Sequence, residues 1–257
     1  MGNQKQSEFM SAIDKIADII KKQDDHDDIL ENANQILGET LGLDRTLIYY
    51  INFDENYIQG LCEWLKDSHP DINATKDKYS LDLFKIPFTQ IKKTQNYLTS
   101  HANSINEHFI GDGSGEMLHG HFKIQSLIWY PFDFDGNNFY VFTLNQILYE
   151  RDWTEDELIF VGSVARQVSL ALMKLKLTDE RQRLKESQKR LHTILDQNPF
   201  PIAVVDVNDE EIHYWSQSAI ETFGHNPGSV SEWYELAYPD PDYREQVIKR
   251  WKPFVER

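Results

Sequence analysis

The sequence is poor in cysteine and in basic residues. Its single cysteine, Cys62, excludes an internal disulfide framework and fits a reducing compartment. Asp and Glu number 42 against 26 Lys and Arg, which gives a formal net charge of -16 at pH 7. Because nucleic acids and anionic membrane surfaces bind basic patches that neutralise phosphate, this balance argues against both as partners. A cytoplasmic location is the simplest interpretation.

Two further absences concern membranes and catalysis. The N-terminus shows no apolar core of the signal-peptide kind, and no stretch comes near the ~18 apolar residues of a membrane span. We therefore expect no direct membrane insertion. The chain also lacks a nucleophile elbow, a kinase nucleotide-binding motif and the Gly-Gly-Asp/Glu loop of a cyclic-dinucleotide cyclase. We expect no catalytic residue and a non-catalytic role.

The composition nevertheless favours a folded protein. Hydrophobic residues make up 40% of the chain and aromatic residues 12%, which is enough for substantial cores. A length of 257 residues suits one large domain or two ordinary ones.

One long helix is predicted from Trp153 to Asn198. Thr154 can accept backbone N–H bonds of the first turn, and acidic residues at 155–157 are favourable beside the positive helix end. Pro199 ends the helix. Its early part carries apolar residues at spacings of three and four, which predicts one face packed on a domain. These residues are Val161, Val164, Ala165, Val168 and Leu172.

A second apolar stripe follows on the same helix. Four leucines lie seven residues apart, with one further apolar residue three positions after the first and the last of them. The stripe consists of Leu170, Met173, Leu177, Leu184, Leu191 and Ile194. This heptad pattern predicts a coiled coil in a homodimer. Glu180 and Ser187 interrupt the stripe, so we expect a weak seam that can hold two packings of similar energy.

The residues before this helix predict an antiparallel sheet. An amphipathic helix ends in acidic residues 24–28, and a second helix follows over 29–41. One β-hairpin is indicated from Arg45 to Trp64 and another from Ile124 to Asn145, separated by an irregular insertion with a helix near residues 84–93. The order helix, hairpin, insertion, hairpin, helix favours an α+β fold with the helices on one face of the sheet.

Four stretches of this region resemble the GAF domain family. They are Leu43-Asp44-Arg45, Cys62-Glu63-Trp64, Lys123-Ile124-Gln125-Ser126-Leu127 before a strand ending in Pro131-Phe132, and Trp153-Thr154-Glu155. The resemblance spans residues 28–176, after an N-terminal helix within residues 1–27. It implies a pocket between the sheet and the insertion, used for a small ligand, a chromophore or a dimer contact. It names no ligand, so the cofactor stays unknown.

The chain after residue 191 resembles the first half of a PAS domain. The similarity rests on Ile194-Leu195-Asp196-Gln197-Asn198-Pro199, strands at 202–207 and 211–215 joined by a turn at 208–210, and the run Trp233-Tyr234-Glu235-Leu236-Ala237-Tyr238-Pro239-Asp240-Pro241. We therefore divide this part into a helical linker, 177–197, and a partial PAS-like α/β module, 198–257. A PAS sheet needs further strands after Trp251, so the chain is either a fragment or holds an incomplete module.

Six residues are candidates for lining the pocket that the GAF resemblance implies: Cys62, Trp64, His119, His121, Trp129 and Tyr130. The aromatic residues fit a domain core equally well. Cys62 also fits a small buried residue on a strand, and a bilin attached there would want a neighbouring His where Glu63 stands.

Histidines of the insertion leave an alternative open. His101 and His108, with His119 and His121, could hold a metal or haem iron together with Cys62. No pair has the spacing of a structural zinc site, so we assign no metal ligand.

Taken together, the two resemblances imply the sensory region of a signal-transduction protein, such as a two-component sensor histidine kinase. The expected partners are a second copy, a small-molecule ligand and a downstream kinase or other output domain. The alternatives are a haem- or metal-binding redox sensor and a ligand-free dimerisation module.

Overall fold

The computed structural model describes residues 2–66, 76–206 and 209–255. The chain forms two compact units, the first ending at Thr178 and the second beginning at Asp179. The helices are α1 (Gly2–Lys22), α2 (His26–Leu41), α3 (Lys85–Thr94), α4 (Glu155–Asp196), α5 (Gln217–Phe223), α6 (Val230–Ala237) and α7 (Pro241–Val255). The strands are β1 (Arg45–Asn52), β2 (Tyr57–Leu65), β3 (Lys78–Ser80), β4 (Leu98–His101), β5 (Ser126–Asp135), β6 (Asn138–Gln146), β7 (Ala203–Val205) and β8 (Ile212–Trp215). Three short helices complete the insertion: η1 (Leu81–Phe84), η2 (Glu107–Phe109) and the π-helix η3 (Glu116–His121).

The first unit is built on one six-stranded antiparallel sheet with strand order β3-β2-β1-β6-β5-β4. Both predicted hairpins are present as β1–β2 and β5–β6, and β1 and β6 join them at the centre of the sheet. The predicted α+β fold class is therefore confirmed. The short edge strands β3 and β4 come from the insertion, for which no strand was predicted.

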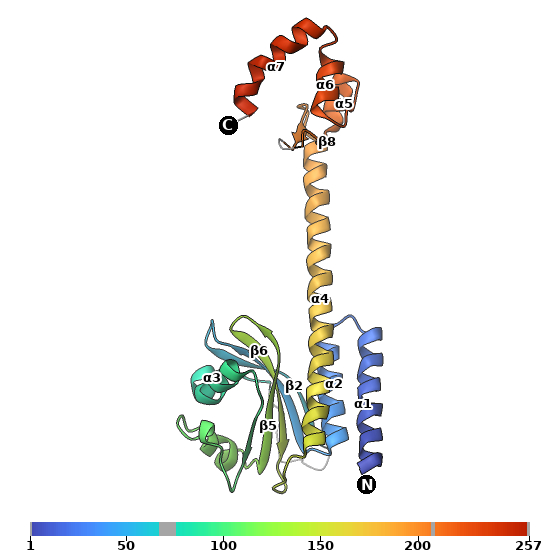
Figure 1. The fold of residues 1–257 in the computed structure, drawn as a ribbon. Coiled ribbons are helices and arrows are strands. Elements are labelled where there is room, and N and C mark those ends of the chain that lie inside the picture. Colours follow the sequence, from blue (N-terminus) through green and yellow to red (C-terminus); the bar gives the residue numbers. More distant parts are fainter. Residues whose placement is uncertain (1, 67–75, 207–208, 256–257) are drawn as a thin grey trace. The chain divides into compact units, whose positions relative to one another are not determined.

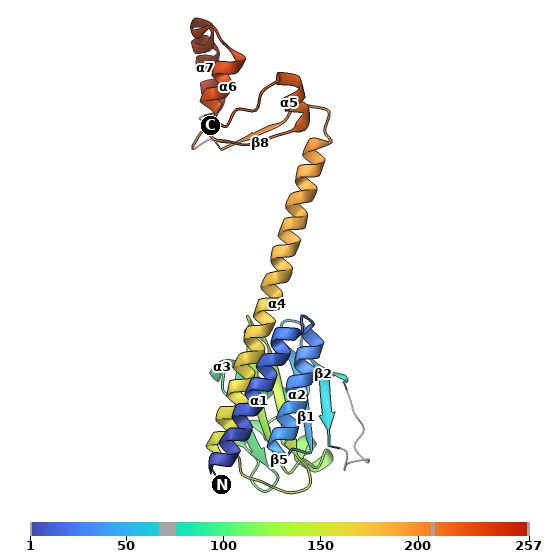
Figure 2. The same ribbon diagram turned by 90° about the vertical axis from the view of Figure 1, so that its right-hand side faces the viewer.

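The two faces of the sheet carry different layers. Helices α2 and α4 cover one face, with α1 packed on their outer side, and α3 with the short insertion helices lies on the other face (Figures 1 and 2). Each face has its own apolar core. Ile48, Phe142 and Val164 belong to the core under α2 and α4. Phe88, Trp129 and Phe139 belong to the core under the insertion.

The starts of α2 and α4 are held by side chains, as the acidic and hydroxyl residues predict. Asp25 accepts hydrogen bonds from the backbone N–H groups of Asp27 and Asp28 at the start of α2. At the start of α4, Thr154 and Glu157 form a reciprocal capping box, with distances of 3.0 and 3.3 Å. Glu157 is 1% exposed and also pairs with Lys5 and Arg151.

One part of α4 corrects an expectation about membranes. An 18-residue window of this helix has a mean hydropathy of 1.5, so by length and composition it could cross a membrane. The sequence therefore does contain such a stretch. Its apolar residues include Val161, Val164 and Val168, which are fully buried against the sheet. A core helix passes the same test, so the window is weak support for a membrane span.

The second unit contains the hairpin β7–β8 and the helices α5, α6 and α7. Ser216 caps α5, and Gly224 ends it with a left-handed φ of 73°, which glycine adopts without strain. The strand and turn predicted over 202–210 are described only in part, because residues 207 and 208 lie outside the described residues.

Candidate functional site

A cavity of about 300 Å³ lies on the insertion side of the sheet. Its wall joins side chains of β1, β5 and β6 to side chains of η1, α3 and η3. Pockets for small molecules span roughly 300–1,000 Å³ and are mostly apolar with a few placed polar groups. This cavity matches the lower end of that range.

One wall of the cavity is a cluster of aromatic rings. Phe88 of α3 stacks on Trp129 of β5, with ring centroids 4.5 Å apart and an interplanar angle of 12°. Phe84 meets Trp129 edge-on at 5.7 Å, and Phe109 supports Trp129 from 5.0 Å. The rings give the cavity a flat apolar surface that suits an aromatic or aliphatic ligand.

One end of the cavity, which adjoins the aromatic wall, is polar. Side chains alternate along β1, so Arg45, Leu47 and Tyr49 all face this side. Arg45 Nε donates a hydrogen bond to Glu63 Oε1 at 2.5 Å, and the two side chains are 11% and 2% exposed. Burial raises the pKa of the Tyr49 phenol far above its ordinary value, so this hydroxyl stays protonated.

Two polar residues of β6 complete this end. Thr143 lies opposite Leu47, and Asn145 lies opposite Arg45. The Thr143 hydroxyl and the Asn145 side-chain carbonyl oxygen are buried, and within the described part of the chain neither has a hydrogen-bond partner. A buried oxygen without a partner costs about 1–3 kcal/mol. The cavity is thus lined by two groups that need a partner.

Of the six pocket candidates predicted from sequence, only Trp129 and His121 line this cavity. Cys62, Trp64 and Tyr130 lie on the other face of the sheet. His119 lines a separate open depression formed by the insertion. The expectation that all six share one pocket is therefore corrected.

Strand pairing explains the division. Residues directly opposite in antiparallel strands point to the same face, and neighbours along a strand point to opposite faces. Cys62 is opposite Ile48, which packs under α2, whereas Leu47 faces the cavity. Tyr130 is likewise opposite Phe142 and next to Trp129. The residue types suit a pocket, but the position of each residue in the strand register decides on which face of the sheet its side chain lies.

Cys62 is a core residue in this arrangement. It is 3% exposed, and burial raises its pKa to about 12, so the thiol stays protonated. A chromophore in the cavity cannot be attached to it, because the sheet lies between them.

Two of the insertion histidines use a ring nitrogen for hydrogen bonds within the protein. His119 donates from Nδ1 to the carbonyl oxygen of Ile124 at 2.6 Å, so its Nε2 accepts from the Ser100 hydroxyl at 2.8 Å. Burial lowers the pKa of His119, which keeps the ring neutral. His101 bonds the Ser126 hydroxyl at 3.0 Å. His121 is exposed at the edge of the cavity.

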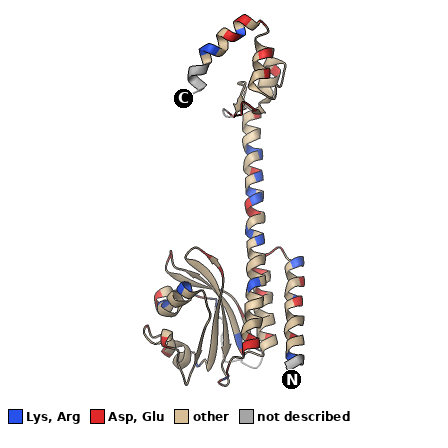
Figure 3. Cartoon of the chain, viewed as in Figure 1, with Lys and Arg blue, Asp and Glu red and all other residues tan. Residues whose placement is uncertain are grey.

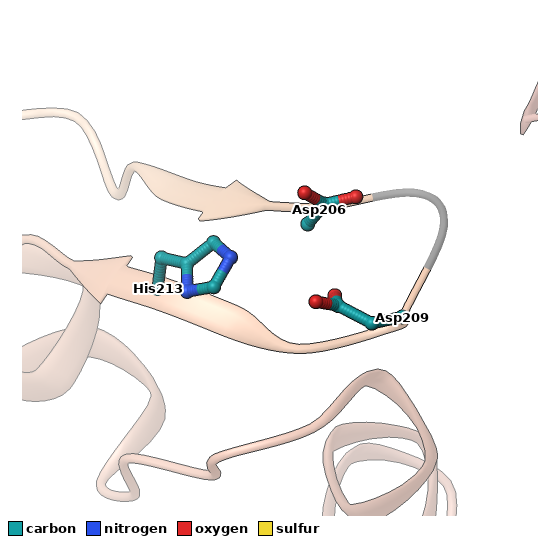
Figure 4. A group of neighbouring side chains, drawn as sticks. All are labelled: Asp206, Asp209 and His213. Atoms are coloured by element: carbon teal, nitrogen blue, oxygen red, sulfur yellow. The ribbon is translucent and has the colours of Figure 1, made fainter.

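Among the described residues, the insertion histidines join no group of three possible metal ligands. One such group lies elsewhere, on the hairpin of the second unit, where Asp206, Asp209 and His213 place ligand atoms within 4.8 Å of one another (Figure 4). Asp209 and His213 are exposed, and exposed acidic groups often lie close together without an ion. We assign no metal site to it.

The six apolar residues predicted for a dimer seam all lie exposed on α4. Their exposed fractions run from 56% for Met173 to 67% for Leu170. Ile159, also 58% exposed, and Ser163 extend the same spacing toward the start of the helix. Along the middle of α4, Lys and Arg outnumber Asp and Glu (Figure 3). Within a single chain, no described residue covers these six side chains.

Sequence reasoning missed the polar end of the cavity. Positions 139, 141, 143 and 145 alternate on one face of β6 and change from apolar Phe139 and Val141 to polar Thr143 and Asn145. A change to polar residues on the buried face of a central strand is the signal that could have identified them.

Comparison with protein families finds two matches. Residues 25–172 match the profile of the GAF domain, and residues 189–256 match that of a PAS domain. A search of curated proteins finds no matching protein. GAF and PAS domains are sensory domains, so their succession supports a role in signal sensing.

Several solved structures share the fold of the first unit. The phycocyanobilin-bound GAF domain of a cyanobacterial phytochrome is 15% identical, with a TM-score of 0.56 over 66% of this chain and 96% of that one. Residues 122 to 287 of a methyl-accepting chemotaxis protein are 18% identical, with a TM-score of 0.51 over 63% and 98%. Free methionine-R-sulfoxide reductase from Neisseria meningitidis, in complex with its substrate, is 13% identical, with a TM-score of 0.50 over 66% and 91%. At these identities the likeness concerns the fold.

Proposed function

Because this chain belongs to the GAF domain family, we propose that its first unit binds a small molecule in the cavity and passes that event along α4 toward the PAS-like module. The observation that carries the proposal is the cavity itself, with an aromatic wall and an adjoining polar end that holds two unpartnered oxygens. The solved GAF domain that holds phycocyanobilin lends support through its fold alone.

Strand β5 provides a physical route between the cavity and α4. Trp129 lines the cavity, while the next residue, Tyr130, lies against Gly162 of α4. Farther along β5, the backbone N–H of Asp133 donates to the Ser169 hydroxyl of α4 at 3.1 Å, and Lys176 of α4 pairs with the Asp133 carboxylate at 3.3 Å. A ligand that moves Trp129 would therefore act on the packing of α4.

Native mass spectrometry of the freshly purified chain, compared with its denatured mass, tests ligand binding. Extra mass that is lost on denaturation would support the proposal and give the size of the ligand. A coloured protein that carries iron or another metal would instead favour a haem or metal sensor. A bare protein that binds no small molecule would favour the ligand-free dimerisation module.

We also propose that the chain is a homodimer held by the exposed seam of α4. Exposed apolar side chains continue onto α1, where Met10 is 67% exposed beside a groove that Ile159 and Phe160 also line. Basic residues such as Lys176, Arg183 and Arg190 flank the seam, and like charges repel across a parallel pair. Added salt screens this repulsion, so the dimer should tighten as ionic strength rises.

Leu177→Asp combined with Leu184→Asp tests the seam. Both leucines are 58% exposed in one copy, so the double variant should fold normally and sediment as a monomer. Gln182→Asp with Lys189→Asp, on the opposite side of the helix, is the control and should stay dimeric. An unchanged mass for the leucine variant would reject the seam.

The order GAF, long helix, PAS supports a cytoplasmic input region that regulates a downstream output domain, such as the kinase of a two-component system. In a full-length protein with a kinase output, inserting one residue after Lys185 would rotate the downstream helix by about 100°. This change should alter basal kinase activity, and equal activity would argue against a relay through α4.

A further inference from the structure

The polar end of the cavity contains two oxygens that lack a hydrogen-bond partner in the described part of the chain: the side-chain carbonyl oxygen of Asn145, which can only accept, and the hydroxyl of Thr143, which can accept or donate. The Thr143 hydroxyl oxygen and the Asn145 side-chain carbonyl oxygen are both buried without a partner in the described residues, and both residues are 3% exposed. Other buried oxygens without a partner, such as Oδ1 of Asn34, belong to residues outside the cavity wall. Buried polar groups in folded proteins are almost always paired, so a group that occupies the cavity can supply what is missing.

The charges near these oxygens cancel. The Arg45 guanidinium faces the cavity, but its Nε donates to the Glu63 carboxylate at 2.5 Å, and both side chains are buried. An anionic ligand would have to compete with Glu63 for Arg45 or leave a second negative charge buried without a partner, which is unfavourable. His121 is exposed to solvent at the edge, where a charge contributes little. The described wall therefore disfavours an anion.

Asn145 adds a directional requirement. A side-chain amide accepts through its oxygen and donates through its nitrogen, so it is complementary to another amide, which presents the same two groups in reverse. Thr143 lies two residues along the same strand, opposite Trp129 and next to the aromatic wall. A planar ligand that lies along Trp129 and Phe88 would thus reach the Thr143 hydroxyl first and the Asn145 side-chain amide beyond it.

We propose that the cavity selects an uncharged, flat aromatic or heteroaromatic compound that carries a carboxamide or lactam, with an N–H group donated to the Asn145 carbonyl oxygen and a hydrogen bond to the Thr143 hydroxyl. This inference rests on the proposed function, because it assumes that the cavity is a ligand site. It identifies the chemical class of the ligand and sets it apart from anionic compounds of the same shape.

Three probes of one shape separate these requirements. 2-Naphthamide carries an uncharged amide, 2-naphthoate replaces it with a carboxylate, and 2-acetylnaphthalene keeps the carbonyl but has no N–H. Each is titrated into the full-length chain at pH 7.5 and followed by isothermal calorimetry. We expect 2-naphthamide to bind at least about tenfold more tightly than either analogue, the size of effect that one well-made hydrogen bond gives.

The outcomes distinguish the two levels of the proposal. Equal or tighter binding of 2-naphthoate or 2-acetylnaphthalene would overturn the ligand class and leave a ligand-binding cavity in place. Failure of all three probes to bind would overturn the class and also count against the cavity as a small-molecule site.

Thr143→Val tests the same contact from the protein side, because valine keeps the shape and removes the hydroxyl. The free variant should melt at the same or a higher temperature, since an unpaired oxygen is gone, while its affinity for 2-naphthamide falls about tenfold. Thr143→Ser keeps the hydroxyl and should retain binding. A lower melting temperature of the free Thr143→Val variant with unchanged affinity for 2-naphthamide would show that the hydroxyl is structural and overturn the assignment.

Discussion

The two units of this chain differ in what they bury. Of the apolar side chains that are buried in the described residues, all but Ala219 and Pro227 belong to the first unit. The second unit leaves large apolar side chains exposed, among them Phe223 at 46%, Leu236 at 47% and Trp251 at 54%. Burial of apolar surface is the main favourable term in folding, at roughly 25 cal/mol per Å². The first unit thus has its own source of stability, whereas the described part of the second is held by local hydrogen bonds and by contacts between partly exposed aromatic rings.

The contrast also bears on function. A sensor needs one part that keeps its shape around a ligand and another part whose state can change. The first unit packs apolar side chains on both faces of its sheet. The second offers an apolar face around Val205 and Trp215 that the described residues leave partly open. If the units work as we propose, a partner surface that covers this face would set the state of the second unit.

The largest test of the contrast removes one phenylalanine from each unit. Phe142 is fully buried and stacks on Phe132 with centroids 4.3 Å apart, so Phe142→Ala should lower the free energy of unfolding of the first unit by about 3–5 kcal/mol. Phe223→Ala, at a half-exposed site, should cost less than about 1 kcal/mol. Both losses in unfolding free energy can be measured by urea titration of the whole chain, with hydrogen exchange read out separately for peptides from each unit. Equal losses would mean that the second unit has a core of its own.

A smaller effect is expected from one ion pair in each unit. Glu157→Gln leaves Arg151 without its buried partner and should cost roughly 3 kcal/mol, whereas Glu245→Gln breaks an exposed pair with Lys249 and should change nothing measurable. Thermal unfolding of both variants at pH 7 makes the comparison. A loss in Glu245→Gln as large as that in Glu157→Gln would contradict it.

Glu157 also predicts how stability depends on pH. Burial acts to raise its pKa, but the hydrogen bonds from Lys5 and Thr154 and the charge of Arg151 outweigh it and hold the pKa below its ordinary value of 4.5. The stabilising contribution is therefore present above pH 4.5 and is lost as the pH falls through the lowered pKa. Glu157→Gln should flatten the fall in melting temperature below pH 4.5, and the exposed control Glu155→Gln should keep the wild-type profile.

The smallest effect concerns one helix cap in each unit. Asp25 caps α2, and Ser229 caps α6 by accepting from the Glu232 backbone N–H. Replacing either with Ala costs about 1 kcal/mol locally. Asp25→Ala should shift the global transition of the first unit, whereas Ser229→Ala should only speed amide exchange within α6. A global shift from Ser229→Ala would show that the second unit unfolds as one cooperative body.

Much of the fold could be predicted from the sequence because its signals are local. The hairpins follow from alternating apolar strands around short turns, and α4 follows from its cap and its apolar spacing. The edge strands β3 and β4 were missed because they are three and four residues long and exist only through pairing with distant strands.

The candidate site was predicted less completely, for a different reason. Trp129 was identified from its residue type, but Thr143 and Asn145 were not, because a polar residue on a strand gives no sign of which face it occupies until the register is known. Trp64 and Tyr130 were wrongly assigned to the pocket for the same reason, because the register that places them on the other face is not visible in the sequence. Residue type indicated what a pocket needs, and strand pairing decided which residues form it.

The contact between Gly38 and Trp64 carries a consequence for the evolution of this domain. A Cβ atom on Gly38 would overlap the six-membered part of the Trp64 ring, so α2 can approach β2 only because one partner is as small as possible. The two positions should therefore change together among relatives of this chain. Those that keep the tryptophan should keep the glycine, and those with a small residue on the strand are free to carry a larger one on the helix.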